Sequence, residues 1–248
     1  MKGLERAAEL VAAARRGVAV TGAGVSAESG IRTFRGENGL WKQYDPVKVS
    51  SIGYFLQDPA FYWEVSRERW RTYQQARPNP GHYALAELEA AGHLAAVVTQ
   101  NTDNLHREAG SQRLVELHGN GRTVRCLDCG ASEPRAEVQA RLETEMPPRC
   151  RACGGRHLKP TVVFFGEPMP AAATAEAFEL AQGCDVMLVV GSSLTVRPAA
   201  DVPAAAVEQG APLVIVNDEP TYMDELAAVV LRGRSGEILP ELRRLVGG

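Results

Sequence analysis

The sequence lacks the features that mark membrane, secreted and strongly basic proteins. Its apolar runs, such as residues 186–190, have only the length of a strand, far short of the roughly 20 residues of a membrane-spanning helix. The N-terminus has neither the apolar core nor the cleavage site of a signal peptide. Lys and Arg number 27 against 30 Asp and Glu, a net charge of −3, which excludes binding of nucleic acid through bulk positive charge. We therefore expect a soluble, cytoplasmic protein.

Cysteine is also scarce, and four of the five cysteines fall into two Cys-x-x-Cys pairs. Residues 130–149 separate Cys126 and Cys129 from Cys150 and Cys153. In an intracellular chain this grouping predicts a metal site rather than disulfides. Four thiolates close a tetrahedral Zn²⁺ site and leave no position for water, so the zinc is expected to be structural. Cys184 stands apart and is expected to be a small buried hydrophobe.

Strand-like and helical segments alternate along most of the chain. Short, largely apolar runs without charge in their interior, typical of strands buried on both faces, occupy residues 17–21, 95–99, 185–190 and 212–216. Helices are predicted between and after them at residues 4–15, 82–91, 171–182, 199–209 and 238–246. The alternation predicts an α/β fold with an open, parallel, Rossmann-like sheet.

Two segments interrupt this alternation. Residues 37–75 are rich in aromatic and charged side chains and are predicted to be helical, and residues 119–158 contain the cysteines with little core of their own. We interpret them as a helical insertion and a zinc ribbon that form a smaller domain. The Rossmann-like domain would then comprise residues 1–36, 76–118 and 159–248.

A glycine-rich turn follows the first predicted strand. Gly22 and Gly24 would let the backbone approach a pyrophosphate, with Ser26 and Gly30 further along. A simple tight turn is the alternative interpretation. The P-loop sequence Gly-Lys-Ser/Thr is absent, as is the acidic residue about 20 positions later that a dehydrogenase would carry. A hydride-transfer enzyme therefore fits poorly.

Polar residues follow the second predicted strand, where open α/β sheets bind ligands. Gln100, Asn101 and Asp103 could bind ribose hydroxyls or a carboxamide, whereas Asp103 alone could simply cap the next helix. His118 lies between the two predicted domains, and a histidine near its ordinary pKa is a natural general base at neutral pH.

The motifs, taken in order along the chain, resemble those of the sirtuin family, in particular its compact bacterial-type members. The resemblance rests on residues 22–36, 99–106, 116–119, the paired cysteines, 163–167, 191–194 and 216–217. It implies an NAD-dependent protein-lysine deacylase that releases nicotinamide and O-acyl-ADP-ribose. It also implies a Rossmann-like domain with a zinc ribbon and a helical insertion.

The resemblance assigns roles to individual residues. The catalytic residues would be Asn101, Asp103 and His118, with His118 as general base. The cofactor-binding residues would be Gly22, Ala23, Gly24, Ser26, Phe34, Arg35, Gln100, Asn101, Asp103, Gly191, Ser192, Ser193, Asn217 and Ser235. The substrate peptide would lie as an added strand between Val163, Phe164, Phe165, Gly166 and Glu167 on one side and Leu194 and Val196 on the other.

Two positions bear on which acyl group the enzyme would remove. Sirtuins that remove succinyl or malonyl groups carry a Tyr-x-x-Arg pair, and the matching positions here are Ser66 and Arg69. The arginine that would pair with an acyl carboxylate is present and the tyrosine is absent. We expect deacetylation, with desuccinylation as a further activity.

Other functions stay open at this stage. The same cofactor site could support mono-ADP-ribosyl transfer, or the chain could be a non-catalytic NAD sensor. Nucleic-acid binding is not expected, because the charge is negative and the ribbon lacks aromatic stacking residues, although it has a cluster of arginines at positions 122, 125, 149, 151 and 156. A monomer is the expected state.

Overall fold

The computed structural model describes residues 2–35 and 39–247, which group into two compact units. The sheet unit comprises Met1–Ile31, Arg77–Leu117 and Pro170–Gly248. The ribbon unit comprises Arg32–Ala76 and His118–Met169. Each unit therefore contains segments that are far apart in the sequence.

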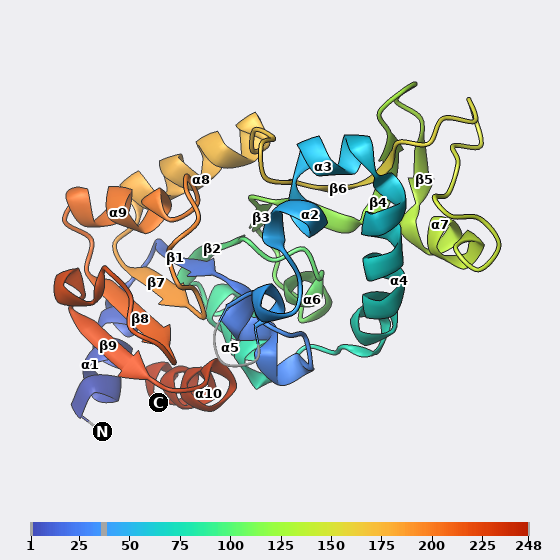
Figure 1. Ribbon diagram of the computed structural model, residues 1–248. Helices are drawn as coiled ribbons and strands as arrows, with labels where there is room; N and C mark the ends of the chain where they lie inside the picture. Colours follow the sequence, from blue (N-terminus) through green and yellow to red (C-terminus); the bar gives the residue numbers. More distant parts are fainter. Residues whose placement is uncertain (1, 36–38, 248) are drawn as a thin grey trace. The chain divides into compact units, whose positions relative to one another are not determined.

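A six-stranded parallel sheet forms the centre of the sheet unit (Figure 1). Its strand order is β3-β2-β1-β7-β8-β9. The strands are β1 (Gly17–Thr21), β2 (Leu94–Thr99), β3 (Leu114–Glu116), β7 (Met187–Val190), β8 (Leu213–Asn217) and β9 (Val229–Arg232). Every residue of β1 and β7 is buried, as expected for central strands covered on both faces. The predicted Rossmann-like sheet is confirmed.

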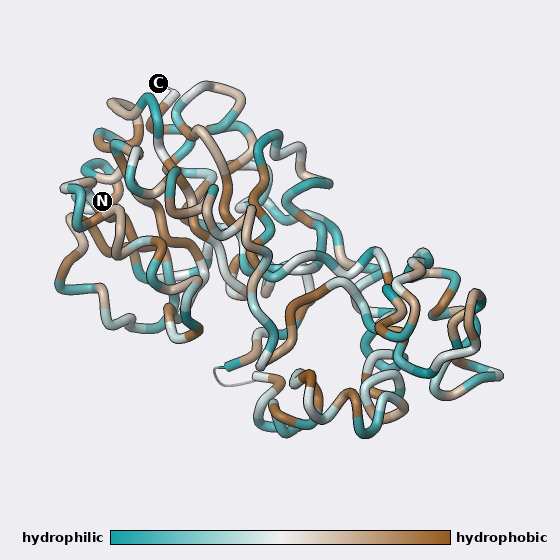
Figure 2. Tube along the Cα trace, turned by 90° about the horizontal axis from the view of Figure 1, so that it is seen from above, coloured by the Kyte–Doolittle hydropathy of each residue, from teal (hydrophilic) through white to brown (hydrophobic). Residues whose placement is uncertain are grey.

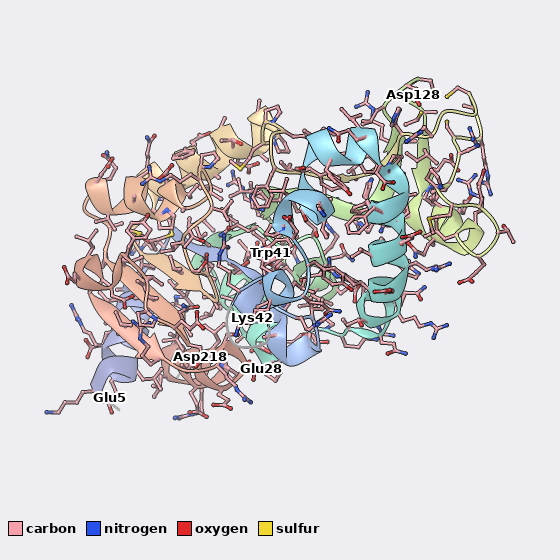
Figure 3. All side chains as sticks on the ribbon, viewed as in Figure 1. Glu5, Glu28, Trp41, Lys42, Asp128 and Asp218 are labelled. Atoms are coloured by element: carbon pink, nitrogen blue, oxygen red, sulfur yellow. The ribbon has the colours of Figure 1, made fainter. Side chains whose placement is uncertain are left out.

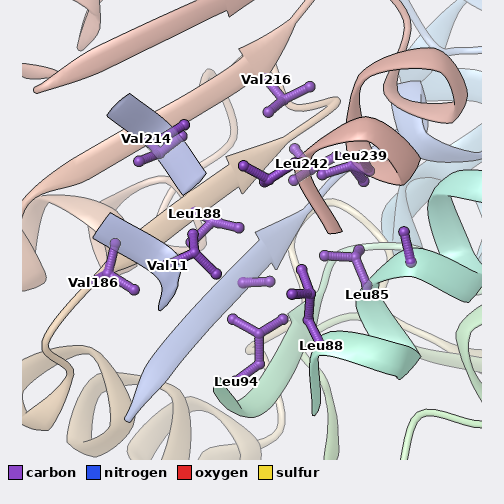
Figure 4. Packing of buried hydrophobic residues seen from close by; sticks show 14 of the residues in the cluster. Val11, Leu85, Leu88, Leu94, Val186, Leu188, Val214, Val216, Leu239 and Leu242 are labelled. Carbon is purple, nitrogen blue, oxygen red and sulfur yellow. The ribbon is translucent and has the colours of Figure 1, made fainter. Parts of the chain in front are cut away.

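Helices cover both faces of this sheet. On one face lie α1 (Lys2–Ala13), α5 (Pro80–Ala90) and α10 (Ser235–Val246), and on the other α8 (Ala171–Gly183) and α9 (Asp201–Glu208). Aliphatic side chains of α1, α5, α10 and the strands form one continuous core (Figure 4). Figure 2 shows brown, hydrophobic stretches of the chain between teal, hydrophilic ones. Among the described helices, none has both the length and the apolar character needed to cross a membrane.

The ribbon unit begins with a series of capped helices. A short 3₁₀ turn, η2 (Leu40–Lys42), precedes α2 (Pro46–Ser50), α3 (Ile52–Gln57) and α4 (Pro59–Gln75). Asp45, Ser51 and Asp58 each accept a backbone N–H of the following helix through the side chain. These caps satisfy otherwise unpaired amides and explain why the segment breaks into separate helices.

The second half of the ribbon unit is a small antiparallel sheet with the order β5-β4-β6. Its elements are β4 (Gly119–Cys126), β5 (Ser132–Pro134), α7 (Arg135–Arg141) and β6 (Leu158–Val162). Trp63 of α4 is fully buried among Val124, Val138 and Leu158, and its indole N–H donates to the Leu158 carbonyl at 3.0 Å. The helical insertion and the ribbon therefore share one core.

The structure moves the expected domain boundaries. Residues 159–169, assigned from sequence to the Rossmann-like domain, belong to the ribbon unit, because β6 pairs with β4 and Phe165 is bonded to residues 50–52. Ala76 and His118 also lie in the ribbon unit. Residues 32–35, also assigned from sequence to the Rossmann-like domain, lie in the ribbon unit as well. The predicted boundary itself, between residues 36 and 37, lies outside the described residues, as does Gly36 of the first motif. The edge strands β3 and β9 were not predicted.

Candidate active site

Three loops of the sheet unit meet at the carboxyl edge of the sheet. They follow β1, β2 and β7, and β1 lies between the other two strands. The chain order reverses between β1 and β7, which makes this the topological switch point where open α/β sheets bind ligands. The candidate residues 22–26, 100–103 and 191–196 all occupy these loops.

Glycines allow two of these loops to touch. The Gly24 amide donates to the Gly191 carbonyl at 2.8 Å. A Cβ on Gly24 would lie 2.7 Å from Gly191 Cα, and one on Gly191 would lie 2.3 Å from the Val25 nitrogen. Gly191 also has a φ of +60°, which favours glycine. Gly24, which was predicted to admit a pyrophosphate, and Gly191 therefore bring the loops after β1 and β7 into backbone contact.

The hydroxyl of Ser26 connects the first loop to the second. Ser26 lies in the 3₁₀ helix η1 (Ala23–Ser29) and is fully buried. Its Oγ donates to Asp103 Oδ2 at 2.7 Å and accepts from Asn101 Nδ2 at 3.0 Å. The Nε2 atom of His82 lies 3.4 Å away. Ser26 was expected to contact the cofactor, and here its hydroxyl organises the two proposed catalytic side chains.

Asp103 makes the contact with the start of the next helix that the capping interpretation of its sequence position predicted. Its Oδ1 accepts from the amide of Leu105 at 3.0 Å, at the start of α6 (Leu105–Glu108), while Oδ2 faces Ser26. Burial raises the pKa of the Asp103 carboxyl, and the two hydrogen bonds oppose that shift. The carboxylate is thus fixed at both oxygens.

Asn101 and Gln100 extend this network to the third loop. Asn101 Nδ2 donates to the Gly22 carbonyl at 3.1 Å as well as to Ser26. Since both amide hydrogens are used, the carbonyl oxygen is the side-chain group of Asn101 left to accept a hydrogen bond. Gln100 Nε2 donates to Ser192 Oγ at 3.1 Å, which ties the loop after β2 to the loop after β7.

Two buried histidines support these loops, and neither was among the residues singled out from the sequence. Burial lowers the pKa of His82 to about 4. Burial, reinforced by His82, lowers the pKa of His106 to about 3. His106 Nε2 lies 2.9 Å from Thr21 Oγ1, and that hydroxyl donates to Thr99 Oγ1 at 2.8 Å. Both imidazoles are therefore neutral at pH 7, which keeps unpaired charge out of the interior.

The remaining sheet-unit candidates lie on the loop after β7 and beyond. Leu194 is buried with a φ of +53°, a strained conformation for a bulky residue and one concentrated at functional sites. Ser193 Oγ lies 3.0 Å from Thr195 Oγ1. Asn217 ends β8 and donates to the Glu219 carbonyl at 2.7 Å. Ser235 is buried at the start of α10, where its backbone lies against Gly81.

The ribbon unit contains the other candidates. The ring of Phe34 stacks on Trp41 at 5.0 Å between centroids, and Phe34 is 39% exposed; Trp41 is labelled in Figure 3. Arg35 is exposed, and its carbonyl accepts from Thr33 Oγ1 at 2.7 Å. His118 is half-buried in the turn between β3 and β4.

The two positions expected to recognise the acyl group are both engaged within the ribbon unit. Ser66 is 8% exposed and its hydroxyl accepts from Arg135 of α7. Arg135 is itself buried between the rings of Trp63 and Trp70. Arg69 donates to the hydroxyl of Tyr73 at 2.8 Å and packs over its ring. These side chains do not form a preformed pair for a carboxylate.

The four paired cysteines form one cluster. Their sulfur atoms all lie within 4.8 Å of one another, with Cys126–Cys153 and Cys129–Cys150 each at 3.7 Å. A sulfur–sulfur bond of about 2.05 Å is excluded by these distances. They agree with the edge of a zinc tetrathiolate, about 3.8 Å for Zn–S bonds of about 2.3 Å. The residues therefore fit the predicted structural zinc.

Each Cys-x-x-Cys pair is closed by a glycine that follows it. The amide of Gly130 donates to the Cys126 carbonyl at 2.9 Å, and that of Gly154 to the Cys150 carbonyl at 2.8 Å. Both glycines have positive φ, +80° and +75°, which a residue with a Cβ adopts only at a cost. The two turns are equivalent and direct all four sulfurs to one point. Asp128, in the first turn, is labelled in Figure 3.

The switch-point loops and the cysteine cluster define a Rossmann-like α/β protein with an inserted metal-binding ribbon. Residues 22–198 match the Sir2 family model. The chain is 50% identical over 247 residues to an NAD-dependent protein deacylase of Thermococcus kodakarensis, covering 98% of this chain and 95% of that protein. The chain belongs to the Sir2 family, as the sequence motifs had indicated.

Solved structures of Sir2 enzymes have the same fold. One, from a study of the mechanism and regulation of Sir2 enzymes, matches with a TM-score of 0.94 and 48% identity over 99% of this chain and 98% of its own. Another, 36% identical with a TM-score of 0.93 and 97% coverage of both chains, is a Sir2 variant with a deacetylated p53 peptide and 3′-O-acetyl-ADP-ribose.

Replacing Gly191 by alanine should destabilise the protein more than the same change at Gly210. Both glycines have positive φ, +60° and +85°, so each substitution carries about 1–2 kcal/mol of backbone strain. Only at Gly191 would the added Cβ also clash with backbone atoms, and this clash adds about 1–3 kcal/mol to the loss of stability. Urea unfolding of both variants measures the difference. Equal losses of stability in the two variants would show that the loops after β1 and β7 can move apart at no cost in free energy.

Replacing Cys129 by serine should release zinc and lower the unfolding temperature. Cys126 and Cys150 are part of the ribbon core, so loss of the metal should unfold that core. Cys184→Ser is the matched control, because Cys184 caps α8 in the sheet unit and donates to the Ala181 carbonyl. Zinc content by mass spectrometry and thermal melting are the measurements. Full stability of zinc-free protein would contradict a structural role.

Proposed function

We propose that this protein removes acyl groups from protein lysines with NAD⁺, as the names of its relatives indicate for them. The observation that carries the proposal is the Ser26–Asn101–Asp103 network at the switch point of a Sir2-family sheet. The carboxyl of Asp103 and the side-chain carbonyl of Asn101 can accept hydrogen bonds, so the network suits a ligand rich in hydroxyl and amide donors. The ribosyl nicotinamide half of NAD⁺ has this chemistry.

The proposed roles of the loop residues follow from their contacts. Asn101 and Asp103 hold the nicotinamide ribose, and Ser26 fixes both side chains in position. Gln100 and Ser192 link the nicotinamide side to the loop after β7. The pyrophosphate is proposed to contact the backbone of Gly22, Ala23 and Gly24. The adenosine half is proposed to contact Gly191, Ser193 and Asn217. Bound NAD⁺ supplies the ADP-ribosyl group and a neutral leaving group, nicotinamide.

His118 is proposed as the general base that activates a ribose hydroxyl. The chain reaches it directly from Leu117, whose amide donates to the carbonyl of Thr99 at the end of β2. The next residues after Thr99 are Gln100 and Asn101. This connection supports the role of His118, as does its partial burial, which favours a fixed ring orientation. Phe34 and Arg35 are proposed to exclude water from the reacting ribose.

The substrate is proposed to be an acyl-lysine peptide bound as an added strand along residues 163–167 and along Leu194 and Val196. Strand addition uses main-chain hydrogen bonds and so tolerates many sequences around the lysine. We propose acetyl-lysine over succinyl-lysine, because Ser66 is buried against Arg135 and Arg69 is bonded to Tyr73. Neither side chain is then poised to pair with an acyl carboxylate.

The proposal includes a cytoplasmic, monomeric enzyme that does not bind nucleic acid. Five free cysteines suit a reducing compartment. The ribbon arginines that suggested a basic surface include Arg149, Arg151 and Arg156, which donate to acceptors of the protein itself. Their guanidinium groups are thus less available to phosphates.

The decisive experiment incubates the enzyme with matched acetyl-lysine and succinyl-lysine peptides, with and without NAD⁺, and follows masses. NAD⁺-dependent loss of the acetyl mass with formation of O-acetyl-ADP-ribose is the expected result, and the succinyl peptide should react more slowly. Unchanged peptides together with radiolabelled protein from labelled NAD⁺ would favour ADP-ribosyl transfer instead. Binding of NAD⁺ with neither reaction would favour a non-catalytic sensor.

His118→Ala should abolish deacylation and leave NAD⁺ binding and the fold nearly unchanged. Loss of a general base lowers kcat by about 10²–10⁴-fold. His93→Ala is the control, because His93 directly precedes β2 at the opposite edge of the sheet. Steady-state kinetics and calorimetric NAD⁺ binding are the measurements. Turnover of His118→Ala close to that of His93→Ala would remove His118 from the mechanism.

A further inference from the structure

A buried ion pair lies beneath the proposed peptide-binding segment. The ammonium of Lys159 is 2.9 Å from Glu167 Oε2, with 7% of the lysine side chain and 24% of the glutamate side chain exposed. A charge is buried at high cost unless it is paired and hydrogen-bonded. Lys159 has no role among those implied for the motifs, so its burial at this place calls for an explanation.

All three ammonium hydrogens of Lys159 are used within this segment. Besides Glu167, Nζ donates to the carbonyl of Pro160 at 3.1 Å and to that of Val162 at 2.7 Å. An ammonium group has three donors, so its hydrogen bonding is complete. The ring of Phe164 covers the charge at 4.4 Å from its centroid. Lys159 therefore fixes the backbone just before the segment and the carboxylate at its end.

Glu167 closes the segment into a tight turn. Its Oε2 accepts from the amide of Phe164 at 2.7 Å, and its own amide donates to the Phe164 carbonyl at 3.0 Å. Gly166 has a φ of +90°, as the third position of a type II turn requires. Phe165 lies at the exposed tip of this turn. The ion pair and the turn therefore share one carboxylate.

The same contacts determine which backbone groups a peptide could reach. The Val163 amide donates to the His118 carbonyl, and Phe165 exchanges backbone hydrogen bonds with Ser50 and Ile52. Among the described residues, these bonds leave the carbonyl of Val163 and the amide of Gly166 without a partner. A strand needs such open groups in register to add to an edge.

We infer that Lys159 is a positioning residue for the acyl-lysine peptide, acting through Glu167. The ion pair holds the Phe164–Glu167 turn so that the open groups of Val163 and Gly166 face the incoming strand. The inference rests on the proposed function. It assigns Lys159 no contact with the substrate and no part in binding NAD⁺.

The test compares Lys159→Met, Glu167→Gln and Lys159→Arg with the wild type in deacetylation kinetics. Both neutral variants should raise KM for the peptide about tenfold, with KM for NAD⁺ and kcat changed less than twofold. Lys159→Arg keeps the charge and should recover most of the loss. Arg113→Met is the control, because it removes an exposed ion pair to Glu176 in the sheet unit, where little effect is expected.

The outcomes separate the inference from the function on which it rests. Wild-type enzyme inactive on every acyl peptide would overturn the proposed function and the inference together. Active enzyme with an unchanged peptide KM in folded Lys159→Met, or a loss that appears only in melting temperature, would overturn the inference alone. If Lys159→Met fails to fold, Glu167→Gln decides, since it removes the negative charge of the ion pair while its side-chain oxygen can still accept from the amide of Phe164.

Discussion

Backbone atoms of Gly24 and Gly191 touch where the strand order of the parallel sheet reverses, with a hydrogen bond of 2.8 Å between them. No side chain larger than hydrogen fits on either side of this contact. The loops after β1 and β7 are therefore held together before any ligand arrives. Such preorganisation lowers the entropic cost of binding at a site built from separate loops.

The loop after β1, which makes this contact through Gly24, also contributes Ser26 to the polar network of the site. Ser26, Asn101 and Asp103 come from two loops and satisfy one another in a buried network. A buried network of this kind is stabilising only when every member has its partners. His82 and His106 complete its surroundings as neutral rings, because burial lowers the pKa of both.

Much of this arrangement could be predicted from local sequence. Buried strands are continuous apolar runs, and metal knuckles have a fixed spacing, so β1, β2, β7, β8 and the cysteine cluster were all found. The edge strands β3 and β9, which were missed, have only one buried residue each and so differ from the central strands. Contacts such as Ser26–Asp103 join residues 77 positions apart, and the pairing of β6 with β4 moved a boundary. Local periodicity contains no information on such partners, and it also missed His82, His106 and Lys159.

The shared core of the ribbon unit has a practical consequence for spectroscopy. The chain has three tryptophans, and Trp41, Trp63 and Trp70 all lie within Arg32–Ala76 of that unit. Trp63 is fully buried, and the guanidinium of Arg135 lies 4.7 Å from its ring. Intrinsic tryptophan emission therefore reports on the ribbon unit alone, because the sheet unit contains no tryptophan. Unfolding of the ribbon unit can be followed in this way without attaching any label.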